Sequence, residues 1–473
     1  MSKFDTYFPW FGLTFVHTWL FFEQSLGFNA VIFSIISVSL ITLHHELQGE
    51  KMWWYGVCGH LIAATAVAWH GTDEAAVAYY FSSFLLAGLV FSVRSSLPVA
   101  LLNGIAGSFM VALVASIPVL IADSQQKLSA MPFMSGAARR RAYLYVAPLS
   151  VTVVFYLLYC VANPDFFIEI RLPEWELNVK LVFYVIFGLI VLCPFFFSWG
   201  FRNLVDWDAA QPNMLKRFRL DNRGTAIGLI HENRQGVIMF VMLNPLIALF
   251  LLFNFLQIFI PSLSHVQSSH SEQVHQGFGT LIVSILVAIV LIMYYFRGNQ
   301  NFYSRNRPLI LLATIWIGLN ALLAIFTCYK NVLYVDAFGL TYKRIWVFIG
   351  MMLTVIGLCF TLFKINHLRT NWYLIRRNTW VLYFMLTSYT AVDWDRIITW
   401  YNSNYAQEFD IEYILALGNT KLPYLKEMQE KDDPRSKGYQ ERISMMVSNA
   451  YPPPHSWKEE TLDNLWLKAR LGK

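Results

Sequence analysis

The sequence predicts an all-α protein, a polytopic bundle of transmembrane helices that ends in a small polar helical C-terminal segment. Of its 473 residues, 56% are hydrophobic and only 14% are charged, and the mean hydropathy is +0.45. A soluble domain carries about a quarter charged residues and cannot bury this much apolar surface. The apolar residues gather in long runs, and the basic residues lie in the short loops between these runs. We therefore expect lipid to surround most of the chain.

The apolar runs set the number of expected helices. A transmembrane helix needs about 20 mainly apolar residues. Runs near this length occupy residues 9–22, 28–43, 53–69, 75–93, 97–122, 144–162, 177–200, 236–260, 277–296, 308–328, 345–363 and 379–392. Because the first and last runs are short for a bilayer, we expect about 11–12 spans. Prolines within these runs predict kinks rather than breaks, since neighbouring helices can satisfy the freed carbonyl groups.

Charge on the loops predicts the orientation. A polar stretch with His265 and His270 precedes the run 277–296, and a loop with Arg297, Arg305 and Arg307 follows it. Short loops rich in Lys and Arg stay in the cytoplasm, so the arginine end is expected inside. With that assignment the inside loops hold about seventeen basic residues and the outside loops about seven. We expect a multi-pass protein of the inner (cytoplasmic) membrane.

The composition changes after residue 392. Residues 1–392 are expected to form the multi-pass transmembrane domain, and residues 393–473 a polar segment. Apolar residues recur there at helical spacing, for example at Ile397, Ile398 and Tyr401, which indicates short amphipathic helices. If the run 379–392 spans the bilayer, this segment lies outside.

Several classes of function are excluded or find no support. The five cysteines are scattered without CxxC spacing, so neither a disulfide framework nor a cysteine zinc site is indicated. The basic residues are divided among loops instead of forming one patch, which argues against nucleic-acid binding. No nucleophile or phosphate-binding motif stands in a credible context.

The most informative group of charged residues lies between the runs 308–328 and 345–363, on the predicted outside. It contains Lys330, Asp336, Thr341, Lys343 and Arg344. A glycine permits a turn, Thr341 can cap the following helix, and Lys343 and Arg344 would then occupy its first turn. Cations there oppose the helix dipole, so a partner is needed. Asp336 is one candidate partner, and a phosphate or carboxylate ligand is the other, because helix N-termini bind anions.

A second group could hold a divalent metal. Histidines and a glutamate are predicted near the outer membrane face, and neutral imidazole is a good metal ligand. The residues are His44, His45, His60, His270, Glu272 and His275. The HxExxH spacing differs from the HExxH of zinc proteases, and on a helix it does not put all three side chains on one face. A hydrated polar turn is the alternative interpretation.

Motifs in the second half of the chain carry a family resemblance. They occupy residues 273–278, 294–298, 316–320, 334–344, 392–397 and 401–402. With these motifs the chain resembles an uncharacterised family of bacterial multi-pass membrane proteins that is defined by a domain of unknown function (type 4153/4173). The resemblance implies a bacterial inner-membrane location and implies no activity.

The leading functional expectation is a protein that binds or moves an anionic or lipid-like ligand, such as an anionic lipid or a small anion, at its outer face. Two alternatives stay open. One is a membrane-embedded metal-dependent enzyme that uses the His/Glu group. The other is a structural or assembly subunit that meets a protein partner through the C-terminal segment.

Overall fold

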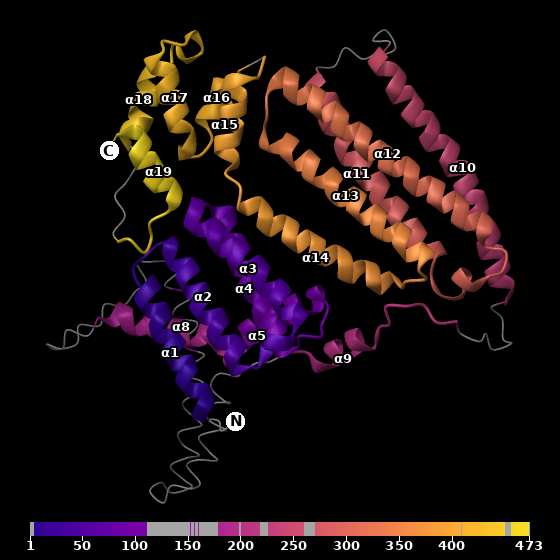
Figure 1. Ribbon diagram of the computed structural model, residues 1–473, viewed down its shortest axis with the longest axis horizontal. Coiled ribbons are helices and arrows are strands. Elements are labelled where there is room, and N and C mark those ends of the chain that lie inside the picture. The colour runs from indigo at the N-terminus through magenta and orange to yellow at the C-terminus, as the bar shows by residue number, and fades with distance from the viewer. Residues whose placement is uncertain are drawn as a thin grey trace, which may run out of the picture. The chain divides into compact units, whose positions relative to one another are not determined.

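Figure 1 shows the computed structural model of the chain. The structure describes residues 4–110, 152, 156, 159, 178–197, 200–217, 226–259, 270–407, 409–449 and 456–472. For residues 4–5, 109–110, 226–227, 257–259 and 270–282 the description covers the backbone alone. Among the described residues all regular elements are helices, apart from one isolated β-bridge between Met214 and Arg369. The prediction of an all-α fold is confirmed.

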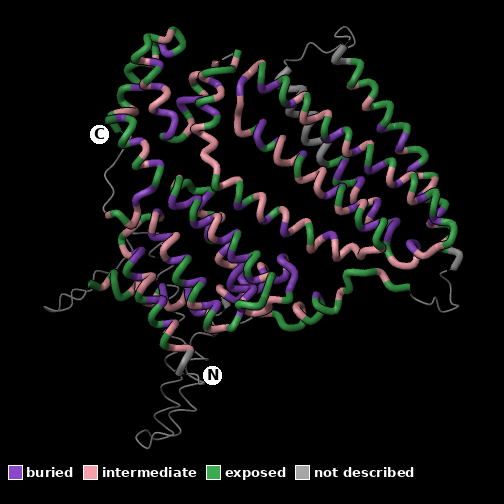
Figure 2. Tube along the Cα trace, viewed as in Figure 1, coloured by how far each residue is buried: buried purple, intermediate pink, exposed green. Residues whose placement is uncertain are grey.

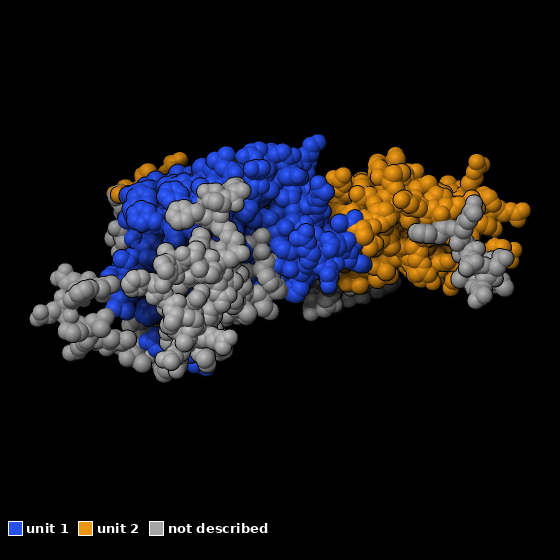
Figure 3. Space-filling view, turned by 90° about the horizontal axis from the view of Figure 1, so that it is seen from below, with its two compact units in different colours: residues 1–209, 387–391, 453–465 blue, residues 210–386, 392–452, 466–473 orange. Residues whose placement is uncertain are grey.

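The chain forms two compact units, and Figure 3 distinguishes them by colour. The first comprises Met1–Ala209, Thr387–Ala391 and Pro453–Leu465. Its helices are α1 (Phe4–Phe21), α2 (Phe28–His44), η1 (Leu47–Gly49), α3 (Lys51–His70), α4 (Asp73–Phe91), α5 (Leu97–Met110), α8 (Val179–Phe196) and nearly all of α9 (Arg202–Ala210).

The second unit comprises Ala210–Leu386, Val392–Pro452 and Trp466–Lys473. Its long helices are α10 (Ala226–Phe259), α11 (His270–Tyr295), α12 (Arg307–Phe338), α13 (Tyr342–Asn366) and most of α14 (Asn371–Thr390), with η5 (Gly298–Phe302) between α11 and α12. Shorter helices follow: α15 (Trp394–Asn404), α16 (Ile411–Leu415), η6 (Asn419–Lys421), α17 (Leu422–Glu430), η7 (Pro434–Ser436) and α18 (Gln440–Asn449). The last helix, α19 (Leu462–Leu471), begins in the first unit and ends in the second.

Every predicted apolar run coincides with a helix where the structure describes it. Residues 111–122 of the run 97–122 and almost all of the run 144–162 lie outside the described residues. Pro194 and Pro245 lie inside α8 and α10, which continue through them as expected. Pro118 and Pro148, by contrast, are outside the described residues.

Five of the described helices are long and apolar enough to cross a membrane, namely Asp73–Phe91, Val179–Phe196, Gly228–Leu256, Arg307–Phe338 and Tyr342–Asn366. Figure 2 shows that α10 is exposed along most of its length. The exposed residues of α10 include large apolar ones such as Val241, Met242, Leu246 and Leu249. Soluble monomers rarely expose apolar patches of this size. The chain is therefore an integral membrane protein.

The second unit has a continuous apolar core between α10, α11, α12 and α13. Phe240, Ile285, Leu309 and Trp316 lie in it, one from each of α10 and α11 and two from α12. The ring of Phe240 lies 6.1 Å from that of Tyr295 and 6.2 Å from that of Trp316. These contacts hold α10, α11 and α12 together and leave the ends of the helices to carry the polar residues.

The first unit brings α4 and α5 into backbone contact. A Cβ atom added at Gly88 would overlap the carbonyl oxygen of Ala100, and one added at Gly104 would overlap that of Phe84. Small residues permit this close approach between membrane helices, where packing rather than the hydrophobic effect drives association.

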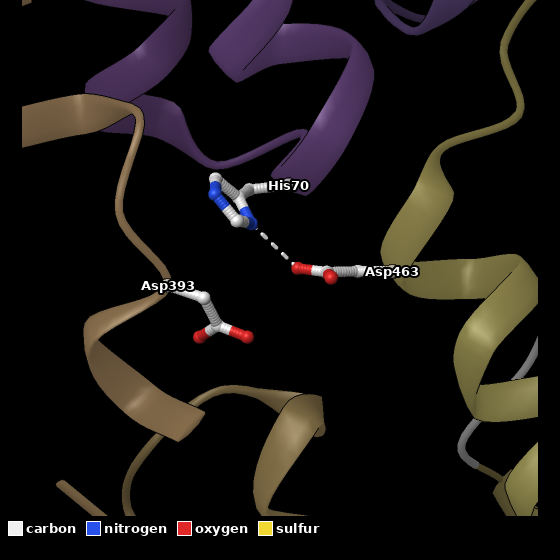
Figure 4. Close-up of side chains that lie close together, drawn as sticks. All are labelled: His70, Asp393 and Asp463. Atoms are coloured by element: carbon white, nitrogen blue, oxygen red, sulfur yellow. Dashed lines mark hydrogen bonds and ion pairs between the residues drawn. The ribbon is translucent and has the colours of Figure 1, made fainter. Parts of the chain in front are cut away.

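The end of the chain returns to the first unit and completes the start of α2. The backbone N–H of Phe28 donates to the carbonyl oxygen of Glu460 (3.1 Å), and that of Asn29 donates to Lys458 (2.9 Å). Helix N-termini leave such groups without intrahelical partners. Further along, His70 Nδ1 lies 2.7 Å from an Asp463 carboxylate oxygen (Figure 4). Asp393, also drawn there, is the N-cap of α15 in the second unit.

The α4–α5 contact predicts a selective effect of glycine substitution. Gly88→Ala should lower the free energy of unfolding by about 1–3 kcal/mol, because the methyl group forces the two helices apart. Gly318→Ala in α12 is the matched control, since nothing lies within 4 Å of its added Cβ atom. Thermal unfolding of both variants in detergent tests this expectation, and an equal midpoint for the two would contradict it.

Candidate functional site

The predicted anion-binding residues surround the turn between α12 and α13. We call residues 334–344 the α12–α13 corner. The apolar run was expected to end at residue 328, but α12 continues to Phe338, so Lys330 and Asp336 are helical residues. Gly339 follows with φ +79°, a conformation that favours glycine. The turn itself is therefore only residues 339–341, and Lys343 lies in the first turn of α13 as predicted.

The start of α13 is capped differently from the prediction. Thr341 occupies the N-cap position, but its side chain makes no capping hydrogen bond. Instead the backbone N–H of Tyr342 donates to the hydroxyl oxygen of Tyr413 (3.0 Å). A residue of α16 thus satisfies one of the free N–H groups at this helix end.

Arg344 is buried, and α12 provides its hydrogen-bond acceptors. Its guanidinium donates to the carbonyl oxygens of Phe338 (2.8 Å) and Gly339. It also lies 4.3 Å from the ring centre of Tyr334. The carbonyl end of α12 therefore compensates the cation at the start of α13, since helix C-termini attract positive charge.

The three remaining charged residues of the predicted group, Asp336, Lys330 and Lys343, have environments that differ from that of Arg344. The carboxylate of Asp336 accepts a hydrogen bond from the hydroxyl of Tyr401 (3.0 Å). The Lys330 ammonium donates to the side-chain oxygen of Asn254 in α10 (2.7 Å). Lys343 is exposed and has no ion-pair partner among the described residues. Of the predicted group, Lys343 is the cation open to a ligand.

Helix α15 contacts the turn through Asn402. The backbone N–H of Leu340 donates to Asn402 Oδ1 (2.5 Å), and Asn402 Nδ2 donates back to the Leu340 carbonyl oxygen (2.9 Å). A Cβ atom at Gly339 would lie 2.6 Å from Asn402 Oδ1, so the glycine also makes room for this amide.

Two sequence motifs that lie about sixty residues apart thus meet in space. Besides the Asn402 contact, the Tyr342 hydroxyl donates to Asp395 Oδ1 (2.9 Å). The motif at 334–344 supplies the turn, and the motif at 392–402 supplies Asp395, Tyr401 and Asn402. We had not predicted site roles for these three residues, although they belong to the motifs that carry the family resemblance.

Burial changes the acidity of several groups around the corner. It raises the pKa of Tyr401, and the hydrogen bond to Asp336 adds to this effect. It also raises the pKa of Tyr413. Lys421, buried behind α16, has its pKa lowered by burial to about 8. Its ammonium donates to the carbonyl oxygens of Leu415 (2.6 Å) and Leu417 at the end of that helix.

The histidines of the metal hypothesis are placed as follows. His45 Nε2 lies 2.6 Å from the carbonyl oxygen of Phe195, and His60 Nδ1 lies 2.8 Å from the hydroxyl of Ser82. His60 is buried midway along α3. The ring of His44 lies 4.7 Å from that of His45. Within the described part of the chain, none of these three histidines belongs to a group of three metal-ligating side chains.

The other half of that hypothesis lies at the start of α11. His270, Glu272 and His275 are in its first two turns, and their side chains lie outside the described residues. A metal site there stays a prediction.

The Asn402 contact can be tested by removing its amide. Asn402→Leu should destabilise the docking of α15 by about 1–3 kcal/mol, because it leaves a partly buried N–H and a carbonyl of Leu340 without partners. Hydrogen exchange of residues 394–415 should accelerate accordingly. Asn404→Leu is the control, since the Asn404 amide donates only to its own helix at Trp400. Equal exchange in both variants would show that the amide does not hold α15.

The lowered pKa of Lys421 predicts a pH effect of defined sign. Between about 8 and the ordinary 10.5, the unfolded chain holds this proton more tightly than the folded chain. The free energy of unfolding of the wild type, relative to that of Lys421→Met, should therefore rise with pH in this window by roughly 1–3 kcal/mol. The neutral amine can still donate to both carbonyls. Urea unfolding of the full chain in detergent at several pH values measures the difference, and a constant difference would contradict the assignment.

The comparisons with known proteins give a family and no activity. No curated protein and no solved structure matches the chain. The profile of the family described as "Domain of unknown function (DUF4153)" matches residues 32–428. This range includes the α12–α13 corner and the motif of α15 that contacts it, and it confirms the resemblance that the sequence motifs indicated. The chain belongs to the DUF4153 family.

Proposed function

We propose that this protein binds or moves an anionic or lipid-like ligand at the α12–α13 corner, on the outer face of a bacterial inner membrane. The observation that supports the proposal most directly is Lys343. It is an exposed cation in the first turn of an apolar helix, and no described carboxylate pairs with it. The N–H groups of a first helical turn also attract anions, so ammonium and backbone can bind the same phosphate or carboxylate.

Aromatic residues support a position at the depth of lipid headgroups. Trp346, one turn after Lys343, is 43% exposed. Trp400 of α15 and Tyr405, the residue after that helix, are 45% and 61% exposed. Trp and Tyr gather where the hydrocarbon layer meets water. A ligand at Lys343 would therefore lie at the edge of the membrane, where a phospholipid headgroup or a small anion is available.

Arg344 has a positioning role in this proposal. Its Nη1 group donates to the carbonyl oxygens of Phe338 and Gly339, so it fixes the turn from which Lys343 projects. Lys330 is more distant along α12 and is bound to Asn254. Asp336, held by Tyr401, leaves a negative charge near the corner that would disfavour a second anion.

The orientation rests on the distribution of basic residues. The loop between α11 and α12 and the turn between α13 and α14 with the start of α14 contain several arginines, and they lie at the opposite end of α12 and α13 from the corner. Because arginine-rich short loops stay in the cytoplasm, the corner is assigned to the outer face.

A matched pair of lysine variants tests the proposal. Lys343→Gln should weaken retention of an anionic ligand about fivefold to tenfold, since one close cation is worth roughly 1 kcal/mol or slightly more. Lys437→Gln removes an exposed lysine of the C-terminal segment and should change nothing. The measurement is a native mass spectrum of the full chain released from membranes, with thermal unfolding as the check on folding.

The same sample separates the other functions. An anionic phospholipid retained by the wild type and lost by Lys343→Gln supports the proposal, whereas equal retention in both variants overturns it. Stoichiometric metal in elemental analysis would favour the metal-dependent enzyme of His270, Glu272 and His275. A stoichiometric second protein without ligand would favour the assembly subunit.

A further inference from the structure

The end of the second unit opposite the α12–α13 corner carries a large positive surface. It is formed by the start of α10, the loop from α11 to α12 with the first residue of α12, the turn from α13 to α14, the start of α14 and the chain before residue 218. We call it the basic face, and its cations are Lys216, Arg217, Arg234, Arg297, Arg305, Arg307, Arg369, Arg376 and Arg377.

Hydrogen bonds hold these segments together. The buried ammonium of Lys364 in α13 donates to the carbonyl oxygen of Phe296 at the end of α11 (2.8 Å). The side-chain amide of Asn371 in α14 donates to the carbonyl oxygen of Met293 (3.1 Å). The ends of α11, α13 and α14 are therefore fixed relative to one another.

The chain before residue 218 is fixed to the same place. The N–H of Leu215 donates to the carbonyl oxygen of Leu368 (2.8 Å), and the N–H of Thr370 donates to that of Asn213 (3.2 Å). These bonds place Lys216 and Arg217 directly after a segment that pairs with the α13–α14 turn. Two distant parts of the sequence thus contribute cations to one surface.

Aromatic rings position several of the guanidinium groups. Arg297 lies 4.0 Å from the ring centre of Tyr294. Arg369 and Arg377 lie 5.4 and 5.6 Å from the ring centre of Tyr373. Such contacts use the face of a guanidinium and leave the N–H groups at its edge for hydrogen bonds. In Arg297 one of these groups already donates to Glu232 (3.3 Å).

Carboxylates on the described part of this surface are scarce. In residues 210–217, 226–236, 293–309 and 362–378 the only one is Glu232, which lies 3.3 Å from Arg297. Arg305 and Arg307 are exposed and have no ion pair among the described residues. The described residues of the basic face therefore carry a net positive charge, which attracts anions.

The apolar residues beside these cations indicate which class of anion the basic face binds. Exposed apolar residues begin within two turns of the cations, at Ile238 and Val241 in α10, Val290 in α11 and Leu311 in α12. A nucleic acid or soluble phosphoprotein would meet hydrocarbon at this edge, whereas a phospholipid supplies both the phosphate and the acyl chains. We propose that the basic face binds the headgroups of anionic phospholipids in the adjoining leaflet, which anchors this end of the bundle.

The test uses the full chain in nanodiscs that contain equal amounts of phosphatidylglycerol and phosphatidylcholine. Lipids retained after release are counted by native mass spectrometry. The wild type should retain phosphatidylglycerol preferentially. Arg305→Gln/Arg307→Gln removes two cations without described contacts, so the fold should persist, and the preference should fall about fivefold for each charge. Arg369→Gln/Arg377→Gln should act in the same direction.

Controls separate this surface from other anion sites. Lys431→Gln/Lys437→Gln removes two charges from exposed positions of the C-terminal segment and should leave the preference unchanged. Lys343→Gln should leave the contribution of Arg305 and Arg307 unchanged, so this proposal can fail independently of the one for the corner.

Three results would overturn the proposal. One is equal retention of both lipids by the wild type. Another is an equal preference in the arginine variants and the control. The third is displacement of phosphatidylglycerol by inorganic phosphate alone, which would indicate a site for the free anion. Raised salt should weaken the preference, because exposed charges are screened within about 10 Å at 0.1 M ionic strength.

Discussion

Buried cations at the carbonyl ends of helices hold the second unit together. The last carbonyl groups of a helix have no intrahelical donor, and they carry a partial negative charge. Arg344 donates to the end of α12, Lys364 to the carbonyl of Phe296 after α11, and Lys421 to the end of α16. Each cation comes from a later helix, so each hydrogen bond also fixes how two elements meet. Removing one would leave buried carbonyl groups without donors, which costs about 1–3 kcal/mol for each group.

The basic residues of the second unit are therefore of two kinds, those that bind helix carbonyl groups and those that face the surroundings. Arg344 and Lys364 are buried and donate hydrogen bonds within the protein, while Lys343 and most cations of the basic face are exposed. Arg344 and Lys343 are adjacent in the sequence, yet only one of them can meet a ligand without breaking the turn. An anion attracted to this corner therefore meets a single exposed ammonium group, which favours a headgroup held at the surface over a ligand enclosed by several cations.

The fold class, the helices and the family could be predicted from the sequence, because apolar runs and motifs are local signals. The run at 308–328 underestimated α12 by ten residues, since its last turns contain Lys330, Asn331 and Asp336, which look like a loop. Asn331 is buried there and donates to the carbonyl oxygen of Arg344 (3.0 Å). The roles of Tyr342, Asp395 and Asn402 could not be predicted, because they depend on a contact between segments about sixty residues apart. Neither the distribution of charge nor the hydrophobic periodicity indicates such a contact. The choice between Thr341 and Tyr413 as the capping group depends on the same contact.

The two ends of α13 differ in the charge around them, and this difference affects the orientation of the protein in the membrane. A helix of 25 residues is about 37 Å long, enough for its ends to reach both interfaces. At the corner, the described chain places Asp336, Asp395 and Asp410 among the basic residues; at the other end Glu232 is the only carboxylate in the segments that form the basic face. A leaflet with anionic lipid therefore attracts the second end more strongly than the first. The inner leaflet is then the favourable place for the basic face, and the positive loops that predict the topology are the same loops for which we propose lipid binding.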